Sequence, residues 1–250
     1  MLSHEKTYGL LGKSLGHSFS KEYFTDKFSR LKLNYSYHNI ELDNVGEIVS
    51  FVQGHENLKG FNVTVPYKES VIAFLDDIDD TAKEVGAVNT VKVGDTGTLK
   101  GFNTDVTGFQ KLLDNITQTC SLKENKALIL GSGGASKAVQ YVLKKNNFTF
   151  DIVSRTASVN TKTYKEINEM GFKSYTLIIN TTPVGMSPDI DKCLELPYST
   201  LEPHHVFIDL IYTPEETLFL KTARLKKAAT FNGLTMLHEQ AEAAWDIWRT

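Results

Sequence analysis

The feature that most constrains the fold is an apolar run that ends in a glycine-rich turn. Residues 127–130 (Ala-Leu-Ile-Leu) have the character of a buried strand, and Gly131, Gly133 and Gly134 follow before a segment of helical period begins. This order is typical of dinucleotide-binding units, because glycines let the backbone approach the pyrophosphate and the helix directs its first amide groups at it. The sequence predicts a Rossmann-type unit, although Ser136 stands where a third glycine is usual. A turn without a ligand is the alternative that this pattern leaves open.

The next strand indicates which dinucleotide the unit prefers. An NAD-preferring site places Asp or Glu about 20 residues after the glycine turn, where the carboxylate holds the ribose hydroxyls. Here the strand at 150–153 ends in Ser154, Arg155 and Thr156, and Asp151 lies too early, inside the strand. A guanidinium and two hydroxyls suit a 2′-phosphate through charge-assisted hydrogen bonds. NADP is therefore the expected cofactor, and an ordinary solvated Arg is the alternative.

Composition excludes several classes of protein. The chain has 250 residues, 41% of them hydrophobic and 23% charged, which suits one large globular domain or two of ordinary size. A net charge of −3 without a Lys/Arg block argues against nucleic acid as a partner. Cys120 and Cys193 form no metal-binding pattern, so no metal is expected. The polar first residues and the lack of a long apolar run predict a cytoplasmic protein that does not interact with membranes.

Short β-rich runs alternate with segments of helical period, which predicts an α/β fold. Strands are expected near 7–11, 35–41 and 60–65, with a hairpin of 88–93 and 98–102. The strand pattern restarts at 127–130, 150–153, 177–180, 206–211 and 229–231. Helical periodicity appears at Tyr23, Phe24, Phe28 and Leu31, and again at Val71, Ile72, Leu75 and Ile78. We expect domains of 1–103 and 104–235, with a helix at 106–116 between them and a closing helix, 236–250, that packs back onto the first.

A hydroxyl-rich loop at 12–20 precedes the first expected helix. Ser20 is a plausible N-cap there, and capping alone is a sufficient explanation for it. It does not explain Ser18 as well. Two hydroxyls at the amino end of a helix form a good site for a carboxylate.

The stretch 61–68 is polar on one face of an expected strand. Alternation places Asn62 and Thr64 together, opposite the apolar residues, and Pro66 then opens a helix with Lys68 in its first turn. A cation at that end opposes the helix dipole, which favours release of the ammonium proton. That property suits a proton donor, whereas a merely solvated lysine is the alternative.

Three further polar residues have both a structural and a functional interpretation. Asp105 lies at a strand-to-helix junction, where it is a natural N-cap, and Asn89 is a candidate turn or sheet-edge residue. Gln240 lies in the apolar stripe of the closing helix, where it is either a buried hydrogen-bond partner or a ligand contact.

Taken together, these stretches resemble the shikimate dehydrogenase family. The matching blocks are Ser18 and Ser20, then residues 62–68 (Asn-Val-Thr-Val-Pro-Tyr-Lys), 86–90 (Gly-Ala-Val-Asn-Thr), 103–105 (Asn-Thr-Asp), 131–136 (Gly-Ser-Gly-Gly-Ala-Ser), 154–156 (Ser-Arg-Thr), 180–186 (Asn-Thr-Thr-Pro-Val-Gly-Met), 209–212 (Asp-Leu-Ile-Tyr) and 233–240 (Gly-Leu-Thr-Met-Leu-His-Glu-Gln). They occur in the family's order and span nearly the whole chain. The blocks at 62–68 and 103–105 are specific to the family.

The resemblance implies an enzyme of aromatic amino acid (chorismate) biosynthesis that reversibly reduces 3-dehydroshikimate to shikimate with NADPH. It implies an α/β substrate-binding domain followed by a Rossmann-type NADP-binding domain, with the substrate and cofactor in a cleft between them. Lys68 and Asp105 match the catalytic pair. Lys68 is expected to supply the proton to the developing alkoxide, and Asp105 to orient the substrate and hold the lysine. A monomer or a homodimer is expected.

The resemblance also assigns binding residues. The substrate carboxylate is expected at Ser18, Ser20 and Tyr212, and the ring hydroxyls at Asn62, Thr64, Asn89, Asp105 and Gln240. The cofactor is expected against Gly131, Ser132, Gly133, Gly134, Ala135, Ser154, Arg155, Thr156, Thr181, Pro183, Met186, Ile211, Gly233 and Met236, with the two methionines on the nicotinamide side.

At a few positions the sequence departs from the family pattern, which limits how far the roles implied by the resemblance apply near them. Lys21 replaces a proline that often follows the second serine, and Thr235 replaces a common glycine. Val159 stands where many NADP-using members have a second basic residue, although Lys162 is near enough in sequence to replace it. An NAD-preferring quinate/shikimate dehydrogenase is one alternative. A non-catalytic NADP-binding sensor is another, but a sensor needs neither residue of the expected catalytic pair.

Overall fold

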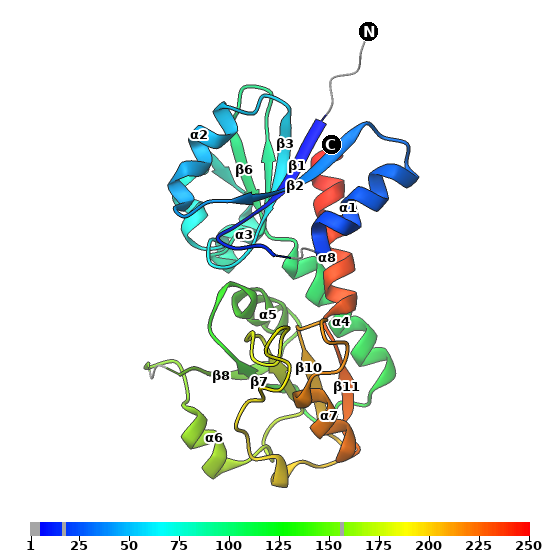
Figure 1. The fold of residues 1–250 in the computed structure, drawn as a ribbon. Helices are drawn as coiled ribbons and strands as arrows, with labels where there is room; N and C mark the ends of the chain where they lie inside the picture. Colours follow the sequence, from blue (N-terminus) through cyan, green and yellow to red (C-terminus); the bar gives the residue numbers. More distant parts are fainter. Residues whose placement is uncertain (1–5, 17–18, 156–157) are drawn as a thin grey trace. The chain divides into compact units, whose positions relative to one another are not determined.

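The chain forms two compact units, each built on one β-sheet (Figure 1). The structure is a computed structural model that describes residues 6–16, 19–155 and 158–250. Unit 1 comprises residues 1–104 and 241–250, and unit 2 comprises residues 105–240. Both units combine strands with helices, which confirms the expected α/β class. The chain passes between the units twice, after Thr104 and after Gln240.

The sheet of unit 1 is mixed. Its strand order is β2-β1-β3-β5-β6-β4, with β1 (Lys6–Gly12), β2 (Tyr35–Glu41), β3 (Leu58–Val63), β4 (Asp77–Ile78), β5 (Thr90–Val93) and β6 (Leu99–Phe102). β1 pairs in parallel with β2 and β3, whereas β5 is antiparallel to both β3 and β6. The expected hairpin is confirmed as β5 and β6, closed by a hydrogen bond from Gly94 N to Thr98 O at 2.8 Å.

Alternating side chains divide unit 1 into two apolar layers. Leu11 and Ile40 pack with α2 (Ile48–Gln53) and α3 (Asp80–Val85) in one cluster. Tyr8 and Tyr37 lie in the other cluster, with α1 (Phe19–Arg30) and the last turns of α8 (Leu234–Arg249). Successive strand residues point to opposite faces, so each strand contributes to both layers.

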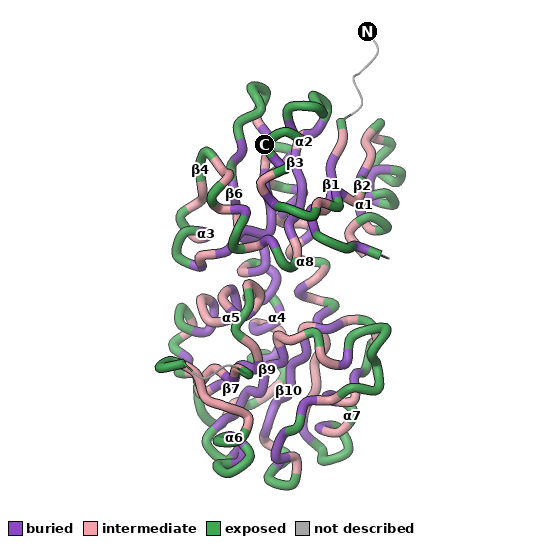
Figure 2. The backbone as a smooth tube through the Cα atoms, turned by 60° about the vertical axis from the view of Figure 1, so that its left-hand side comes forward, coloured by how far each residue is buried: buried purple, intermediate pink, exposed green. Residues whose placement is uncertain are grey.

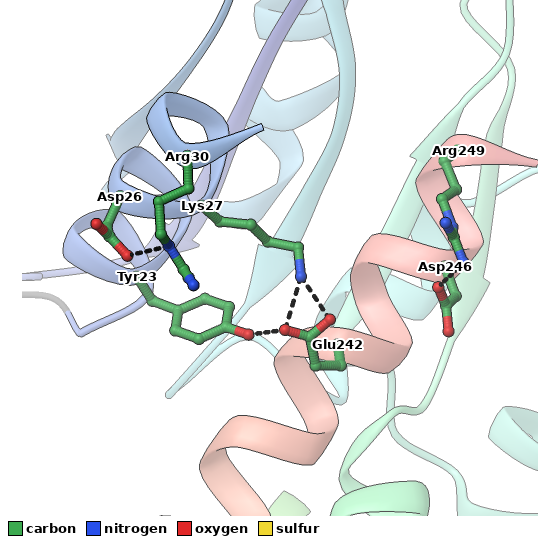
Figure 3. Close-up of polar contacts among 7 residues, drawn as sticks. All are labelled: Tyr23, Asp26, Lys27, Arg30, Glu242, Asp246 and Arg249. Carbon is green, nitrogen blue, oxygen red and sulfur yellow. Dashed lines mark hydrogen bonds and ion pairs between the residues drawn. The ribbon is translucent and has the colours of Figure 1, made fainter. Parts of the chain in front are cut away.

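A partly buried ion pair joins α1 to α8 (Figure 3). Lys27 Nζ donates to both carboxylate oxygens of Glu242, at 2.6 and 2.5 Å, and the Tyr23 hydroxyl donates to the same carboxylate. Burial lowers the pKa of Lys27 and raises the pKa of Glu242. Burial opposes both charges, and each charge offsets this penalty for the other. Loss of either partner would therefore leave a partly buried charge without its counter-charge.

Gly60 on β3 lies against the indole of Trp248, which donates from Nε1 to Val91 O at 3.0 Å. A Cβ at Gly60 would lie 2.3 Å from that nitrogen. Gly60→Ala is therefore expected to lower the free energy of unfolding by about 2 kcal/mol, as overpacking of a core does. Denaturant unfolding measures the change, with Gly54→Ala as control, because the nearest atom to a Cβ at Gly54 is 3.6 Å away. Equal stability of the Gly60 variant and the wild type would contradict this packing.

Unit 2 contains an all-parallel sheet in the order β11-β10-β9-β7-β8. Its strands are β7 (Lys126–Leu130), β8 (Thr149–Val153), β9 (Leu177–Asn180), β10 (Val206–Asp209) and β11 (Ala229–Phe231), which confirms all five strands expected in the second half of the chain. β8 pairs with one side of β7 and β9 with the other. The strand order therefore reverses between β7 and β9, and ligands of such sheets bind at this switch point, beyond the carboxyl ends of the strands.

Helices cover both faces of this sheet. Ala127 and Ile129 pack with α4 (Asp105–Thr119) and α5 (Gly134–Lys145), whereas Leu128 and Leu130 pack with α6 (Tyr164–Met170) and α7 (Leu218–Leu225). Figure 2 accordingly shows β7, β9 and β10 largely in the colour of buried residues. A parallel sheet covered on both faces has continuously apolar strands, which is why these strands stand out in the sequence.

The helix expected from Val71, Ile72, Leu75 and Ile78 was wrong beyond its first turn. Residues 70–74 form a 3₁₀ helix, and Ile78 belongs to the short strand β4. Asp76 N and Asp79 N donate to the carbonyls of Leu99 and Gly101 on β6, each at 2.9 Å. Pairing with β6 satisfies the backbone here, and this non-local interaction outweighs the helical periodicity.

Candidate functional site

The predicted phosphate-binding turn lies at the carboxyl end of β7, at the switch point. Gly131 has φ +110°, and a Cβ there would lie 2.7 Å from Thr181 Oγ1, so the position requires glycine. A Cβ on Gly133 would have no other atom within 4 Å, so the backbone faces open space. α5 begins at the next residue, Gly134, and its first amide groups are available to an anion.

Ser136, which stands in the place of the third glycine, is fully buried on α5. Gln140 Nε2 donates to its hydroxyl at 3.0 Å. The third glycine of such motifs permits close helix–strand packing. A small side chain whose hydroxyl has a partner is compatible with that packing, so the departure leaves the turn intact.

Polar groups at the end of β8 lie beside this turn. Ser154 Oγ is 3.5 Å from Ser132 Oγ, and Arg155 is exposed. Thr156, also expected at the cofactor, lies outside the described residues. The guanidinium of Arg155, the hydroxyls of Ser132 and Ser154, and the first amide groups of α5 form a donor set that fits the phosphates of NADP.

Asp151 and Lys162 have partners within unit 2. Asp151 Oδ2 accepts from the Tyr175 hydroxyl at 2.8 Å, which agrees with its place inside the strand. Lys162 Nζ lies 3.9 Å from Asp151 Oδ1. Lys162 therefore already has an anionic neighbour, which reduces the positive charge that it offers in place of a basic residue at Val159.

The loops after β9 and β10 lie at the same edge of the sheet. Thr181 Oγ1 donates to Leu130 O at 2.8 Å, which holds it beside the glycine turn. In the same loop Pro183 is exposed, and Met186 is 44% exposed. Ile211 follows β10, and its carbonyl accepts from Gly233 N at 3.1 Å.

A fully buried carboxylate, Asp209, ends β10. Its Oδ1 accepts from Asn180 Nδ2 and from Ile211 N, both at 3.0 Å. Its Oδ2 accepts from Thr217 Oγ1 at 2.6 Å. Burial raises the pKa of Asp209 to about 6, although these hydrogen bonds favour the charged form.

This raised pKa predicts a pH-dependent contribution to stability. The folded state retains the Asp209 proton to higher pH than the unfolded chain, so the contribution is complete below about pH 4 and is lost as pH rises through about 6. Asp209→Asn removes the titration. We therefore expect the free energy of unfolding of the wild type to fall relative to that of the variant by on the order of 2 kcal/mol as pH rises from about 4 to about 7. Denaturant unfolding across this range measures it, and parallel pH curves for the two proteins would contradict it.

In unit 1, hydrogen bonds join several of the residues expected to bind substrate. The Ser20 side chain hydrogen-bonds Tyr37, whose hydroxyl donates to Asn62 Oδ1 at 2.8 Å. Asn62 Nδ2 donates to Thr90 Oγ1 at 3.1 Å, and Thr90 Oγ1 lies 3.1 Å from Thr104 Oγ1. Thr104 N also donates to the side-chain oxygen of Asn89 at 2.7 Å. The structure thus connects Ser20, Asn62 and Asn89 in one polar cluster.

Sequence reasoning did not single out Tyr37, Thr90 or Thr104. Thr90 and Thr104 lie inside the matching blocks, next to Asn89 and Asp105, and that adjacency was the available signal. Tyr37 alternates with polar residues in a strand and carries no comparable signal.

Two hydrogen bonds made by adjacent residues hold the turn that carries Lys68. Lys68 O accepts from Val88 N at 2.7 Å, and the hydroxyl of the preceding Tyr67 donates to Leu42 O at 2.6 Å. Lys68 lies in this turn, before the 3₁₀ helix, and not in the first turn of an α-helix. The expectation based on a helix dipole was therefore wrong. Thr64 begins the turn and is half-buried, as is Lys68.

Ser20 also differs from expectation, because α1 begins at Phe19 and places Ser20 inside the helix instead of at its N-cap. Ser18 lies outside the described residues. Asp105 is buried and is the first residue of α4. The sequence predicted Asp105 at the N-cap, the position just before the helix. Gln240 Nε2 donates to Leu237 O of its own helix at 3.0 Å. Tyr212, expected at the substrate carboxylate, is partly buried, and burial raises the pKa of its hydroxyl.

The described residues contain neither a candidate metal site nor a candidate membrane-spanning helix. Within them, His, Cys, Asp and Glu side chains form no group of three or more that is suited to a metal ion. None of the helices there has both the length and the apolar character needed to cross a bilayer.

The parallel sheet and its glycine turn at the switch point define a Rossmann-type dinucleotide-binding protein. Residues 10–91, in unit 1, match the family model of the shikimate dehydrogenase substrate binding domain. The shikimate dehydrogenase (NADP(+)) of Methanococcus maripaludis is 36% identical over 98% of this chain and 92% of its own length. The chain therefore belongs to the shikimate dehydrogenase family, whose members are oxidoreductases.

Solved structures agree with this assignment. A crystal structure of a shikimate dehydrogenase in complex with NADP⁺ has a TM-score of 0.84 at 33% identity, over 98% of this chain and 90% of that one. The Thermus thermophilus enzyme in complex with NADP(H) and shikimate has a TM-score of 0.81 at 29% identity, over 97% of this chain and 93% of its own.

Proposed function

We propose that this chain catalyses the reversible, NADP-dependent interconversion of 3-dehydroshikimate and shikimate. The observation that carries the proposal is its end-to-end similarity to proteins named shikimate dehydrogenase (NADP(+)). Unit 1 is proposed to bind the substrate and unit 2 the cofactor. A cytoplasmic location and a monomeric or homodimeric state stay predictions.

The donor set at the glycine turn supports NADP as the cofactor. Amide groups at the start of α5 suit the pyrophosphate, and Arg155 with Ser154 suits the 2′-phosphate. When bound, NADPH supplies the hydride. Thr181, Pro183, Met186, Ile211, Gly233 and Met236 are proposed to surround its nicotinamide end.

Lys68 is proposed to be the proton donor to the ring oxygen. As a hydride reaches the ring carbonyl carbon, negative charge develops on the oxygen, and Lys68 Nζ gives that oxygen a proton while its charge stabilises it. In the oxidative direction the same nitrogen accepts the hydroxyl proton. Asp105 is proposed to hold the neighbouring hydroxyl and to orient the lysine.

The polar cluster of unit 1 is proposed to bind the ring hydroxyls through Asn62, Thr64 and Asn89, together with Asp105 and Gln240. Asn62 already uses Oδ1 as an acceptor for Tyr37. A carbonyl oxygen has two lone pairs, so Oδ1 can accept a second hydrogen bond from a ring hydroxyl. Ser18, Ser20 and Tyr212 are proposed to hold the carboxylate.

A second candidate is a quinate/shikimate dehydrogenase that prefers NAD. It is favoured by the fully exposed Val159, where a second basic residue is common, and by the ion pair of Lys162 with Asp151. Both features weaken the positive charge around a 2′-phosphate.

The direct test supplies the purified protein with 3-dehydroshikimate and NADPH and follows the absorbance of the reduced nicotinamide. Consumption of NADPH with formation of shikimate, identified by mass spectrometry, is the expected result. NADPH binding without consumption would overturn the proposal in favour of a non-catalytic sensor.

A further inference from the structure

One buried carboxylate joins segments from three parts of unit 2. Asp209 and Asn180 end adjacent strands and are paired in register. Asn180 in turn accepts from Thr182 N at 3.0 Å and from the Thr182 hydroxyl at 2.7 Å. The Asp209 carboxylate is therefore connected, through one amide side chain, to the loop that begins after β9.

The same carboxylate fixes the segment after β10. It accepts from Ile211 N at the start of that segment and from the Thr217 hydroxyl at its end. Thr217 caps α7, where its hydroxyl also accepts from Leu220 N. A Cβ on Gly185 would lie 3.7 Å from Thr217 Cβ, so Thr217 also lies against the loop after β9.

Backbone contacts extend this connection. Ser187 N, just after Met186, donates to Thr213 O at 3.1 Å, which links the two loops a second time. Gly233 N donates to Ile211 O at the same distance and links the residue before α8 to the segment after β10. The segments that meet around Asp209 thus include Met186, Ile211 and Gly233.

The position of these segments indicates which part of a dinucleotide they face. Arg155 ends β8, on one side of the glycine turn, whereas β9 and β10 lie on its other side. A dinucleotide bound with its pyrophosphate at Gly131 and its 2′-phosphate at Arg155 places its nicotinamide beyond β9 and β10.

We propose that Asp209 is a positioning residue, which holds the loops after β9 and β10 in the arrangement that receives the nicotinamide end of the cofactor. The proposal rests on the proposed NADP site. Burying a carboxylate away from water lowers the stability of the folded state. An apolar residue would fill a purely structural position without this desolvation penalty. Its hydrogen-bond donors all come from segments that lead into the loops or α7.

The test compares matched threonine variants. Thr217→Val removes the hydroxyl that Asp209 holds, whereas Thr217→Ser keeps it. Thr176→Val is the control, because Thr176 is equally buried and its hydroxyl accepts from Glu124 N at 3.1 Å, at the amino end of β9. Asp209→Asn is the second variant, and it leaves one of the surrounding donors without its acceptor.

Two quantities are measured for each variant: the dissociation constant of NADPH, from its fluorescence, and amide hydrogen exchange of residues 181–187 and 210–217. We expect Thr217→Val and Asp209→Asn to weaken NADPH binding about tenfold and to speed exchange in both segments, as loss of a buried hydrogen bond does. Thr217→Ser should restore both properties, and Thr176→Val should change neither.

Unchanged NADPH affinity in both Thr217→Val and Asp209→Asn would overturn the proposal. An equal loss of affinity in Thr176→Val would also overturn it, because the effect would then follow from general destabilisation. Neither measurement needs turnover. A wild-type protein that binds NADPH without oxidising shikimate would therefore refute the proposed function and leave the test of Asp209 valid.

Discussion

Replacing Lys68 with alanine is expected to lower kcat for shikimate oxidation by about 100- to 10,000-fold, the usual contribution of a general acid–base group. The alanine can neither exchange the proton with the ring oxygen nor stabilise its charge. KM for shikimate should change much less, because the polar cluster around Asn62 and Asn89 is linked by hydrogen bonds that do not involve Lys68. Steady-state rates measured with saturating NADP give both constants.

Two controls separate chemistry from structure in this experiment. Lys83→Ala removes a surface lysine on α3 that pairs with Asp80 at 3.3 Å, and it should leave kcat unchanged. Added small primary amines should partly restore the rate of Lys68→Ala, because they can carry the proton. Near-normal kcat in Lys68→Ala would refute its role as the proton donor.

Replacing Arg155 with alanine is expected to raise KM for NADP by about 10- to 100-fold, because a charge-assisted hydrogen bond to the 2′-phosphate contributes about 1.5–3 kcal/mol. KM for NAD should change little, since NAD has no 2′-phosphate. The measurement is the pair of KM values at saturating shikimate. Arg224→Ala is the matched control, because Arg224 pairs with Glu216 at 2.6 Å on the surface of unit 2. Equal increases for both cofactors would show that Arg155 does not contact the 2′-phosphate.

The Rossmann-type unit was the most predictable part of the fold. Its central strands β7, β9 and β10 are largely apolar because both faces of the sheet are covered there. The turn at Gly131 requires glycine for a local reason, its φ of +110°. Such local requirements can be read directly from a sequence. The short strand β4 could not be, because it forms only through pairing with β6, a partner that is distant in sequence.

The candidate site was predictable as a set of residues but not as an arrangement. The blocks around Asn62, Asn89 and Asp105 stand out because polar residues occupy strand ends where a core would be apolar. The hydrogen bonds that connect Asn62 to Thr104 through Thr90 depend on strand register, which the sequence does not state. The expected helix at Lys68 was wrong because residues distant in sequence fix the turn there, through hydrogen bonds of Lys68 with Val88 and of Tyr67 with Leu42.

The measurement that tests the account most directly is kcat/KM for shikimate and for quinate, each with NADP and with NAD. Shikimate with NADP is expected to give the highest value of the four pairs. A higher value for either substrate with NAD would contradict the role assigned to Arg155 and favour the quinate/shikimate dehydrogenase. Absence of turnover with all four pairs, in a protein that binds NADPH, would contradict the proposed function itself.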